Sequence, residues 1–274
     1  MTVRRRAAVL GKPIAHSLSP VIHNAGYAAA GLAGWSYTRI ECTESELPGL
    51  VAGLGPEWAG LSVTMPGKEA ALAVADAASP VAVAVGAANT LVRRSDGSWY
   101  ADNTDVTGMI EVLTGAGVRP GATVTVLGAG GTARAALAAA ARLDARAVTV
   151  VARREAAVDE LRPVADAVGV PMLRAGWAEA AARLHADVVI STVPKGVADP
   201  LAETVARRPE AVFFDALYDP WPTPLAAAAA AVGFRVVSGL DLLLAQAVGQ
   251  FEQFTGVPAP REAMAVALAD ARRQ

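Results

Sequence analysis

A glycine-rich turn between an apolar strand and an alanine-rich helix lies in the middle of this chain. Residues 124–127 (VTVL) form the predicted strand, which runs directly into the sequence GAGGTA. This G-x-G-x-x-A spacing is typical of a Rossmann phosphate-binding turn: two glycines allow the turn and close backbone approach, and a small residue lets helix pack on strand. The helix N-terminus then offers free N–H groups to phosphates. We expect a dinucleotide to contact Gly128, Ala129, Gly130, Gly131, Thr132 and Ala133.

Because this turn begins only at residue 128, a separate module precedes it and has room to hold a substrate. We predict an α/β fold of two domains. The first is an N-terminal α/β substrate domain over residues 1–106, completed by C-terminal helices within 240–274. The second is a doubly wound Rossmann domain over residues 107–239, with buried strands near 147–152, 187–192, 212–216 and 234–237.

Composition excludes several classes of protein. The 274 residues are 53% hydrophobic and 18% charged, which predicts an ordered core. The net charge of −2 argues against a nucleic-acid partner, and no apolar run is long enough to predict a membrane span. The only cysteine, Cys42, excludes an internal disulfide and favours a reducing, cytoplasmic location.

Lysine is rare in this arginine-rich chain, occurring only at Lys12, Lys68 and Lys195. A lysine ammonium can release its proton and act in acid–base chemistry, whereas a guanidinium cannot. Lys68 follows the buried strand of the segment GLSVTMPGK, whose Thr64 stands at the strand end where ligands commonly bind. The alternative is an ordinary surface lysine on a helix.

Two further segments carry polar side chains at element ends. In GKPIAHSLSPVIHN, from residue 11, the hydroxyls of Ser17 and Ser19 suit a carboxylate or polyol; the alternative is that Ser19 merely caps a helix with Pro20 at its first position. His16 and His23 lack partners at metal-ligand spacing, so we expect structural histidines and no metal site.

Asn89 lies in GAANT, and Asp105 lies in DNTD. Asp105 is either a cap of the helix predicted over 107–113 or the partner of Lys68 in proton handling. An opposite charge would raise the lysine pKa, whereas burial would lower it.

With these residues the chain resembles the shikimate dehydrogenase family over nearly its whole length. The matching segments, in family order, are GKPIAHSLSPVIHN, VTMPGK, GAANT, DNTD, GAGGTARAAL, DALYDPWPTPL and GLDLLLAQAVGQFEQFTG. The resemblance implies reversible reduction of 3-dehydroshikimate to shikimate with NADPH.

The resemblance also implies residue roles. Ser17 and Ser19 would bind the substrate carboxylate, with Tyr218 close to it. Ring hydroxyls would be bound by Thr64, Asn89, Asp105 and Gln246. Lys68 would exchange the proton of the reacting hydroxyl beside Asp105, making these two the catalytic pair. Leu217 and Gly239 would line the nicotinamide pocket. The chain departs from the family at Ser62, usually Asn, at Leu243 or a neighbour, usually Met, and at Pro80, usually acidic.

The end of the second Rossmann strand indicates which nicotinamide is used. An NAD enzyme usually offers Asp or Glu there, whereas this chain reads Ala152-Arg153-Arg154-Glu155. Two guanidinium groups suit a 2′-phosphate, so we predict NADP and include Ala152, Arg153 and Arg154 in its site. The alternatives are a solvated surface pair and, through Glu155, NAD.

Three other functions remain open at this point. One is a paralogue acting on quinate, with NAD as its alternative cofactor, although Ser19 favours shikimate. Another is a non-catalytic NADP-binding regulator, which would not need Lys68 and Asp105 together. A folate-type dehydrogenase of similar build does not suit the Ser-x-Ser and DNTD segments. We expect a monomer or homodimer whose only partners are small molecules.

Overall fold

The computed structural model describes residues 5–273, and the chain divides into two compact units. The first unit runs to Thr104 and resumes at Leu243, and the second unit spans Asp105–Leu242. Lys68, Asn89 and Gln246 therefore belong to the first unit, and the glycine-rich turn belongs to the second.

The second unit is built on a six-stranded sheet in which every pair of neighbouring strands is parallel. The strands are β7 (Thr123–Leu127), β8 (Ala147–Ala152), β9 (Met172–Gly176), β10 (Val188–Ser191), β11 (Val212–Asp215) and β12 (Arg235–Val237). Their order is β12-β11-β10-β7-β8-β9, so the direction of winding reverses between β7 and β10. This is the doubly wound Rossmann order, with its ligand crevice outside the carboxyl ends of β7 and β10.

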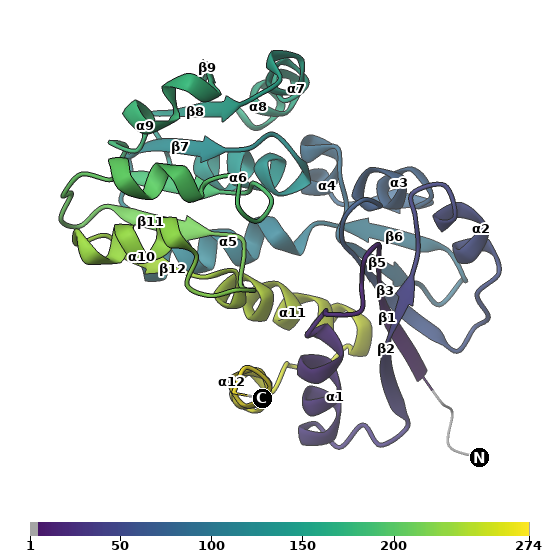
Figure 1. The fold of residues 1–274 in the computed structure, drawn as a ribbon. Helices are drawn as coiled ribbons and strands as arrows, with labels where there is room; N and C mark the ends of the chain where they lie inside the picture. Colours follow the sequence, from purple (N-terminus) through teal and green to yellow (C-terminus); the bar gives the residue numbers. More distant parts are fainter. Residues whose placement is uncertain (1–4, 274) are drawn as a thin grey trace. The chain divides into compact units, whose positions relative to one another are not determined.

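Helices cover both faces of this sheet (Figure 1). They are α5 (Thr104–Gly115), α6 (Gly131–Arg142), α7 (Glu155–Asp159), α8 (Arg162–Val168), α9 (Ala180–Arg183) and α10 (Pro224–Ala231), with 3₁₀ turns at Trp177–Glu179 and Asp199–Thr204. Strands β10 and β11 are buried at every residue, as a parallel sheet covered on both faces requires. The core gathers Leu127, Phe213 and Phe234 among its buried side chains.

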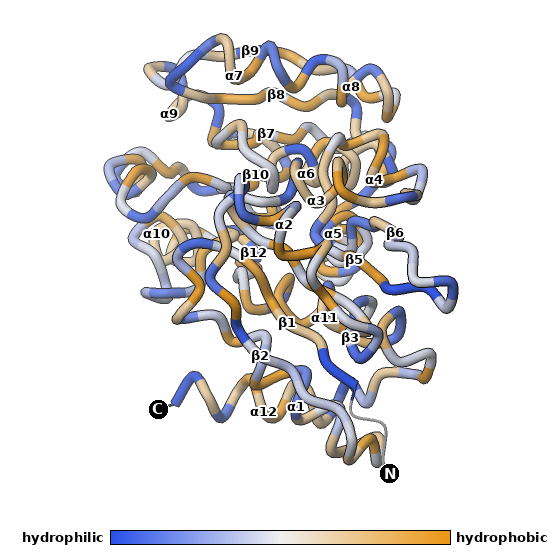
Figure 2. The backbone as a smooth tube through the Cα atoms, turned by 90° about the vertical axis from the view of Figure 1, so that its right-hand side faces the viewer, coloured by the Kyte–Doolittle hydropathy of each residue, from blue (hydrophilic) through white to orange (hydrophobic). Residues whose placement is uncertain are grey.

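The first unit holds a mixed sheet in the order β2-β1-β3-β5-β6-β4. Its strands are β1 (Arg5–Gly11), β2 (Trp35–Glu41), β3 (Trp58–Val63), β4 (Ala77–Ala78), β5 (Thr90–Arg93) and β6 (Trp99–Asp102). β1 pairs in parallel with β2 and β3, whereas β5 is antiparallel to both β3 and β6. The turn between β5 and β6 is hydrophilic (Figure 2), and Gly97 adopts a φ of +88° there.

The C-terminal helices complete the first unit. Its helices are α1 (Ser19–Ala29), α2 (Leu47–Ala52), α3 (Lys68–Ala73), α4 (Pro80–Val85), most of α11 (Gly239–Thr255) and α12 (Arg261–Ala271). α12 packs beside α1 (Figure 1). A side chain at Gly60 would collide with the ring of Phe254, and one at Gly26 would lie 2.9 Å from the ring of Phe251. These two glycines therefore let α11 pack closely against β3 and α1.

Several elements differ from the sequence prediction. The helix expected over 107–113 already begins at Thr104 and extends to Gly115. The elements β4, α4, β9 and α7 to α9 were not predicted from the sequence. They have two to seven residues, too short for a hydrophobic period to register, and β4 exists through its pairing with β6.

His23 has a structural role in the core of the first unit. It is fully buried, and its ring stacks on Tyr37 with centroids 4.1 Å apart and an interplanar angle of 5°. Neither ring nitrogen makes a hydrogen bond of good geometry among residues 5–273, although the side chain of Gln250 lies near enough to oppose part of the effect of burial on the pKa. Burial lowers the pKa of His23 from 6.5 to about 3, so the folded protein keeps this imidazole neutral.

This burial predicts a pH dependence of stability. Below about pH 6.5 His23 is protonated in the unfolded chain but stays neutral in the folded chain. The free energy of unfolding should therefore be highest above that pH and should decrease as the pH falls toward 3. One such proton contributes a slope of about 1.4 kcal/mol per pH unit to the free energy of unfolding. In denaturant titrations, His23→Gln should flatten this slope, whereas His16→Gln, at an exposed position, should not. Equal slopes in both variants would contradict this role of His23.

Candidate functional site

The carboxyl ends of β7 and β10 meet at Gly128. This residue has a φ of +107°, and a Cβ added to it would lie 2.5 Å from Oγ1 of Thr192. Thr192 is held in place because its N–H and its hydroxyl both donate to the carbonyl of Leu127, at 2.8 and 2.9 Å. Only glycine combines this backbone conformation with this close approach, so the turn depends on Gly128.

The residues after Gly128 leave space at the start of α6. Gly130 precedes the helix in an extended conformation, with φ −96° and ψ −167°, and no atom lies within 4 Å of a Cβ added there. Gly131 and Thr132 form the first turn, half-buried, and Ala129 is half-buried before them. Ala133 is fully buried, as close helix packing requires. Free N–H groups beside an open backbone suit a pyrophosphate.

Two arginines follow β8 at the same edge of the sheet. Arg153 and Arg154 come directly after Ala152 and are exposed, and neither guanidinium has a hydrogen bond or ion pair among the described residues. Glu155 begins α7, and its carboxylate lies 3.4 Å from the guanidinium of Arg174. The acidic group that would favour NAD is thus engaged with an arginine, while two cationic groups remain for an anion.

The loop after β11 brings Leu217 and Gly239 together. The N–H of Gly239 donates to the carbonyl of Leu217 at 3.2 Å, and a side chain at Gly239 would collide with the carbonyl of Ala216. Tyr218 follows in the same loop and is half-buried. The start of α11 therefore packs directly on this loop, which requires glycine at 239.

Asp215 is a buried residue beside this loop whose importance was not predicted from the sequence. Its carboxylate accepts hydrogen bonds from the Leu217 N–H at 3.1 Å and from the Thr223 hydroxyl at 2.7 Å. Thr223 in turn caps α10 by accepting from the Ala226 N–H. Burial raises the pKa of Asp215. The available signal was a carboxylate ending an apolar strand at the ligand edge of the sheet.

In the first unit, Thr64 and Lys68 are positioned by the ends of β1 and β3. Thr64 directly follows β3, and its N–H donates to the carbonyl of Leu10 at 2.8 Å. A side chain at Gly11 would collide with Thr64, so the two strand ends approach closely. Lys68 is the first residue of α3, and its carbonyl accepts from the Ala88 N–H at 2.8 Å. This bond ties Lys68 to the segment that carries Asn89.

Asn89 directly precedes β5 and lies in a buried hydrogen-bond network. Its side-chain oxygen accepts from the N–H of Thr104 at 2.8 Å and from the hydroxyl of Thr90 at 2.8 Å. Its side-chain nitrogen lies 3.0 Å from the Thr104 hydroxyl. The conformation of Asn89 is therefore fixed before any ligand binds.

The structure corrects the alternative interpretation of the serine segment, in which Ser19 caps the helix. The helix cap is Leu18, and Ser19 is already the first residue of α1, so Ser19 is not the cap. Ser19 is buried, and its N–H lies 3.3 Å from the hydroxyl oxygen of the half-buried Ser17. The Ser17 carbonyl accepts from the guanidinium of Arg39 at 2.8 Å, which holds this segment beside β2. The prediction that Ser17 and Ser19 bind a carboxylate stays a prediction.

Gln246 and Asp105 complete the predicted set. Gln246 is buried on α11, and its amide nitrogen donates to the Leu243 carbonyl at 2.8 Å. Asp105 is 7% exposed and lies within the first turn of α5, because this helix begins before it. The structure describes Asp105 at the start of the second unit and Lys68, Thr64, Asn89 and Gln246 in the first.

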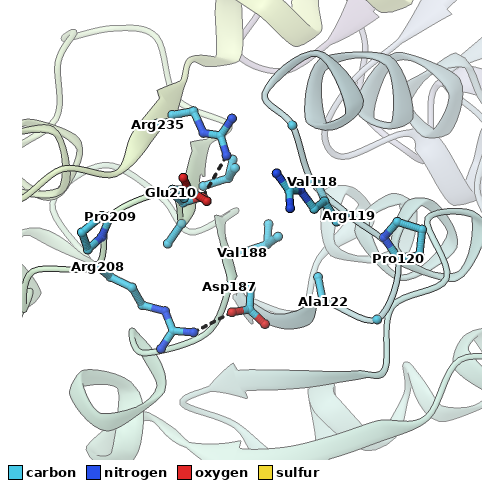
Figure 3. Close-up of a pocket in the computed structure, with 14 residues that line it drawn as sticks. Val118, Arg119, Pro120, Ala122, Asp187, Val188, Arg208, Pro209, Glu210 and Arg235 are labelled. Atoms are coloured by element: carbon cyan, nitrogen blue, oxygen red, sulfur yellow. Dashed lines mark hydrogen bonds and ion pairs between the residues drawn. The ribbon is translucent and has the colours of Figure 1, made fainter.

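A separate pocket of about 430 Å³ opens at the opposite edge of the Rossmann sheet (Figure 3). It is lined by residues that precede β7 and by residues just before or at the starts of β10, β11 and β12, and two of its three arginines are already bound. Arg208 lies 2.6 Å from the carboxylate of Asp187, and Arg235 donates to the Glu210 carbonyl at 3.1 Å. A nucleotide binds at the carboxyl ends of such strands, so this pocket is not the predicted cofactor site.

Metal-binding clusters and membrane-spanning helices are both absent from the described part of the chain. Within residues 5–273, no group of three or more His, Cys, Asp or Glu side chains is arranged to hold a metal ion. Over the same range, no helix has the length and apolar character needed to cross a membrane.

Comparison with known proteins gives matches along the chain. The model of the shikimate dehydrogenase substrate-binding domain matches residues 9–91, and that of the shikimate 5′-dehydrogenase C-terminal domain matches residues 239–268. A shikimate dehydrogenase (NADP⁺) of Caulobacter vibrioides is 41% identical over 264 residues, covering 92% of this chain and 90% of the relative.

Solved structures agree with these matches. The crystal structure of Mycobacterium tuberculosis shikimate dehydrogenase is 51% identical, covers 97% of this chain and 99% of its own, and has a TM-score of 0.88. Shikimate 5-dehydrogenase from Thermus thermophilus, solved with NADP(H) and shikimate, is 31% identical with a TM-score of 0.84, covering 97% of this chain and 99% of its own.

Proposed function

We propose that this chain, which belongs to the shikimate dehydrogenase family, reversibly reduces 3-dehydroshikimate to shikimate with NADPH. The observation that carries the proposal is the position of Lys68. One of only three lysines in the chain starts α3 shortly after the ligand-facing end of β3, and its backbone is tied to the segment of Asn89. An amine at this position supplies the proton that reduction of a ring ketone requires.

The proposed chemistry assigns one proton transfer to the protein. NADPH, when bound, supplies the hydride that reduces the ring carbonyl carbon. The Lys68 ammonium gives its proton to the oxygen of that carbonyl as negative charge develops there, which completes the hydroxyl. Lys68 then regains a proton from solvent, and in the direction of oxidation it accepts the hydroxyl proton. Asp105 is the proposed second member of the catalytic pair.

The remaining predicted residues bind and orient the substrate. Ser17, Ser19 and Tyr218 are the residues proposed for its carboxylate, and hydroxyls are well suited to donate to such an oxyanion. Thr64, Asn89, Asp105 and Gln246 bind the ring hydroxyls. The burial of Asn89 and Gln246 supports this role, because polar side chains positioned in advance bind a polyol with little loss of entropy.

The second unit would hold NADP through three groups of residues. Gly128 to Ala133 suit the pyrophosphate, because Gly130 leaves open space before the N-terminus of α6. Leu217 and Gly239, joined by a hydrogen bond, would line the nicotinamide site. Ala152 ends β8, and the exposed guanidinium groups of Arg153 and Arg154 after it suit a 2′-phosphate.

Replacing Arg153 should change the preference between the two nicotinamide cofactors. We expect Arg153→Ala to raise the KM for NADP⁺ about 10- to 100-fold, the effect of losing one or two charge-assisted hydrogen bonds. The KM for NAD⁺, which lacks the 2′-phosphate, should stay unchanged. Arg162→Ala, at an exposed position that starts α8, is the matched control. Equal losses for the two cofactors would remove Arg153 from the phosphate site.

The reaction itself is tested by its stoichiometry. Purified protein incubated with shikimate and NADP⁺ should form NADPH and 3-dehydroshikimate in equal amounts, with both products quantified after separation. NADPH formed without 3-dehydroshikimate would contradict the proposed substrate.

The single buried Cys42 supports a cytoplasmic, reducing location. We expect a monomer or a homodimer, which the molar mass in solution by light scattering distinguishes.

A further inference from the structure

A chain of buried hydrogen bonds leads from β2 to Asn89. The Tyr37 hydroxyl lies 2.6 Å from the Ser62 hydroxyl, which lies 2.7 Å from the side-chain oxygen of Gln250. The side-chain nitrogen of Gln250 donates to the Asn89 carbonyl at 3.1 Å and to the Thr90 hydroxyl at 3.0 Å. All five residues are at most 4% exposed, and all belong to the first unit.

The direction of every bond in this chain is determined. The Asn89 carbonyl can only accept, so Gln250 must direct its NH₂ group there and its oxygen toward Ser62. Ser62 must then donate to Gln250, and its oxygen accepts from Tyr37. A reversed Gln250 amide would place two carbonyl oxygens against each other without a proton between them.

The same directions continue to the side chain of Asn89. The Thr90 hydroxyl accepts from Gln250, so its own proton is donated to the Asn89 side-chain oxygen at 2.8 Å. The Thr104 N–H donates to that oxygen as well, which occupies both of its lone pairs. One N–H of the Asn89 amide reaches Thr104, and the other has no partner among the described residues. Asn89 is thus arranged to offer a ligand an N–H and no acceptor.

We propose that Tyr37, Ser62 and Gln250 are positioning residues that hold Asn89 as a hydrogen-bond donor to a ring hydroxyl oxygen of the substrate. The inference rests on the proposed function for the identity of the ligand. It gives a role to Ser62, at which the chain departs from its family, and to Gln250, which was not singled out from the sequence. The short serine side chain leaves room for both the Tyr37 hydroxyl and the Gln250 amide to reach it.

α11 supplies a matched control for this proposal. Gln253 lies three residues after Gln250 on the same helix, and its side-chain nitrogen donates to the carboxylate of Asp102 at 2.7 Å. Gln250 and Gln253 therefore each attach the helix to the β5–β6 region by a side-chain amide. Gln253 reaches only Asp102, whose carbonyl accepts from the backbone N–H of Asn89 at 3.1 Å. Gln250 alone hydrogen-bonds to Asn89 itself and, through Thr90, sets the direction of its side chain, so a purely structural role predicts similar effects at the two positions.

The experiment compares Gln250→Leu, Gln253→Leu and Ser62→Ala in the full chain. For Gln250→Leu and Ser62→Ala we expect the KM and the calorimetric Kd for shikimate to rise about tenfold, roughly the effect of one misdirected hydrogen bond. The KM for NADP⁺ should stay within about twofold, since the cofactor residues belong to the second unit. Gln253→Leu should leave shikimate binding unchanged, although its melting temperature falls.

The double variant Ser62→Ala with Gln250→Leu tests the connection itself. Because both residues act through one chain, the double variant should bind shikimate no more than about twofold worse than Gln250→Leu alone. Equal effects of Gln250→Leu and Gln253→Leu, or independent effects of Ser62→Ala and Gln250→Leu, would overturn the proposal. If Gln250→Leu does not fold, Ser62→Ala against Gln253→Leu gives the same comparison. Wild-type protein that binds shikimate without turnover would reject the proposed reaction alone, because binding still measures the positioning effect.

Discussion

Replacing Lys68 with alanine should lower kcat for shikimate oxidation by about 10²–10⁴-fold, the usual effect of deleting a general acid–base group. This loss corresponds to roughly 3–5 kcal/mol in the activation barrier. The KM for shikimate should change much less, because the ring hydroxyls and the carboxylate keep their other predicted partners. Lys68 is the residue that starts α3 after Thr64, so truncation beyond its Cβ leaves the β1–β3 strand ends intact.

Two further variants separate proton transfer from charge. Lys68→Arg keeps a positive charge that does not release its proton, so its kcat should fall nearly as far as that of Lys68→Ala. Lys12→Ala removes an exposed lysine whose ammonium lies 3.4 Å from Glu41, and it should retain wild-type kcat. Steady-state kinetics of the three variants would exclude Lys68 as the proton donor if Lys68→Ala kept near-wild-type turnover.

Gly128→Ala and Gly130→Ala should have different effects: the first should lower the stability of the fold, and the second should weaken the binding of NADP⁺. At Gly128 the φ of +107° and the contact with Thr192 oppose a side chain, so Gly128→Ala should destabilise the fold by about 2–4 kcal/mol. At Gly130 the backbone is extended and the space is open, so Gly130→Ala should keep the wild-type melting temperature. Its added methyl group occupies the space predicted for the pyrophosphate, and we expect a roughly 10- to 100-fold weaker Kd for NADP⁺.

Thermal unfolding and NADP⁺ titration of the two variants provide this comparison. Stability should fall at Gly128, and cofactor affinity should fall at Gly130 in a protein of normal stability. Tight NADP⁺ binding by Gly130→Ala would show that the phosphates do not approach this backbone. Normal stability in Gly128→Ala would show that the strand ends are less tightly apposed than the Thr192 hydrogen bonds indicate.

Local sequence patterns predicted the Rossmann unit well, because its signals are contained in short segments. The apolar strand, the glycine spacing and the alanine-rich helix are contiguous, and the structure confirms an α/β fold with β7 followed by α6. The reversal of strand order between β7 and β10 is not visible in any one segment. It follows from how six separate strands pair.

Long-range side-chain contacts could not be predicted from the sequence. Ser62 and Gln250 are 188 residues apart, and nothing in either segment indicates that they share a hydrogen bond. Asp215 presents the same difficulty, because its role depends on burial and on Thr223 eight residues later. Local patterns singled out Lys68, the glycine-rich turn and the two arginines, whereas the substrate-binding roles came from the family resemblance. The contacts of all these residues with ligands stay predictions.

The most direct test of the central claim is the rate of nicotinamide reduction by purified protein with shikimate or quinate, each offered with NADP⁺ or NAD⁺. We expect fast turnover with shikimate and NADP⁺ alone. Comparable turnover with quinate or with NAD⁺ would contradict the assigned specificity and direct attention to Ser62 and Glu155. If folded protein that still binds NADP⁺ showed no turnover in any of the four mixtures, the proposal that this protein is a dehydrogenase would be contradicted. That result would indicate a non-catalytic NADP-binding regulator.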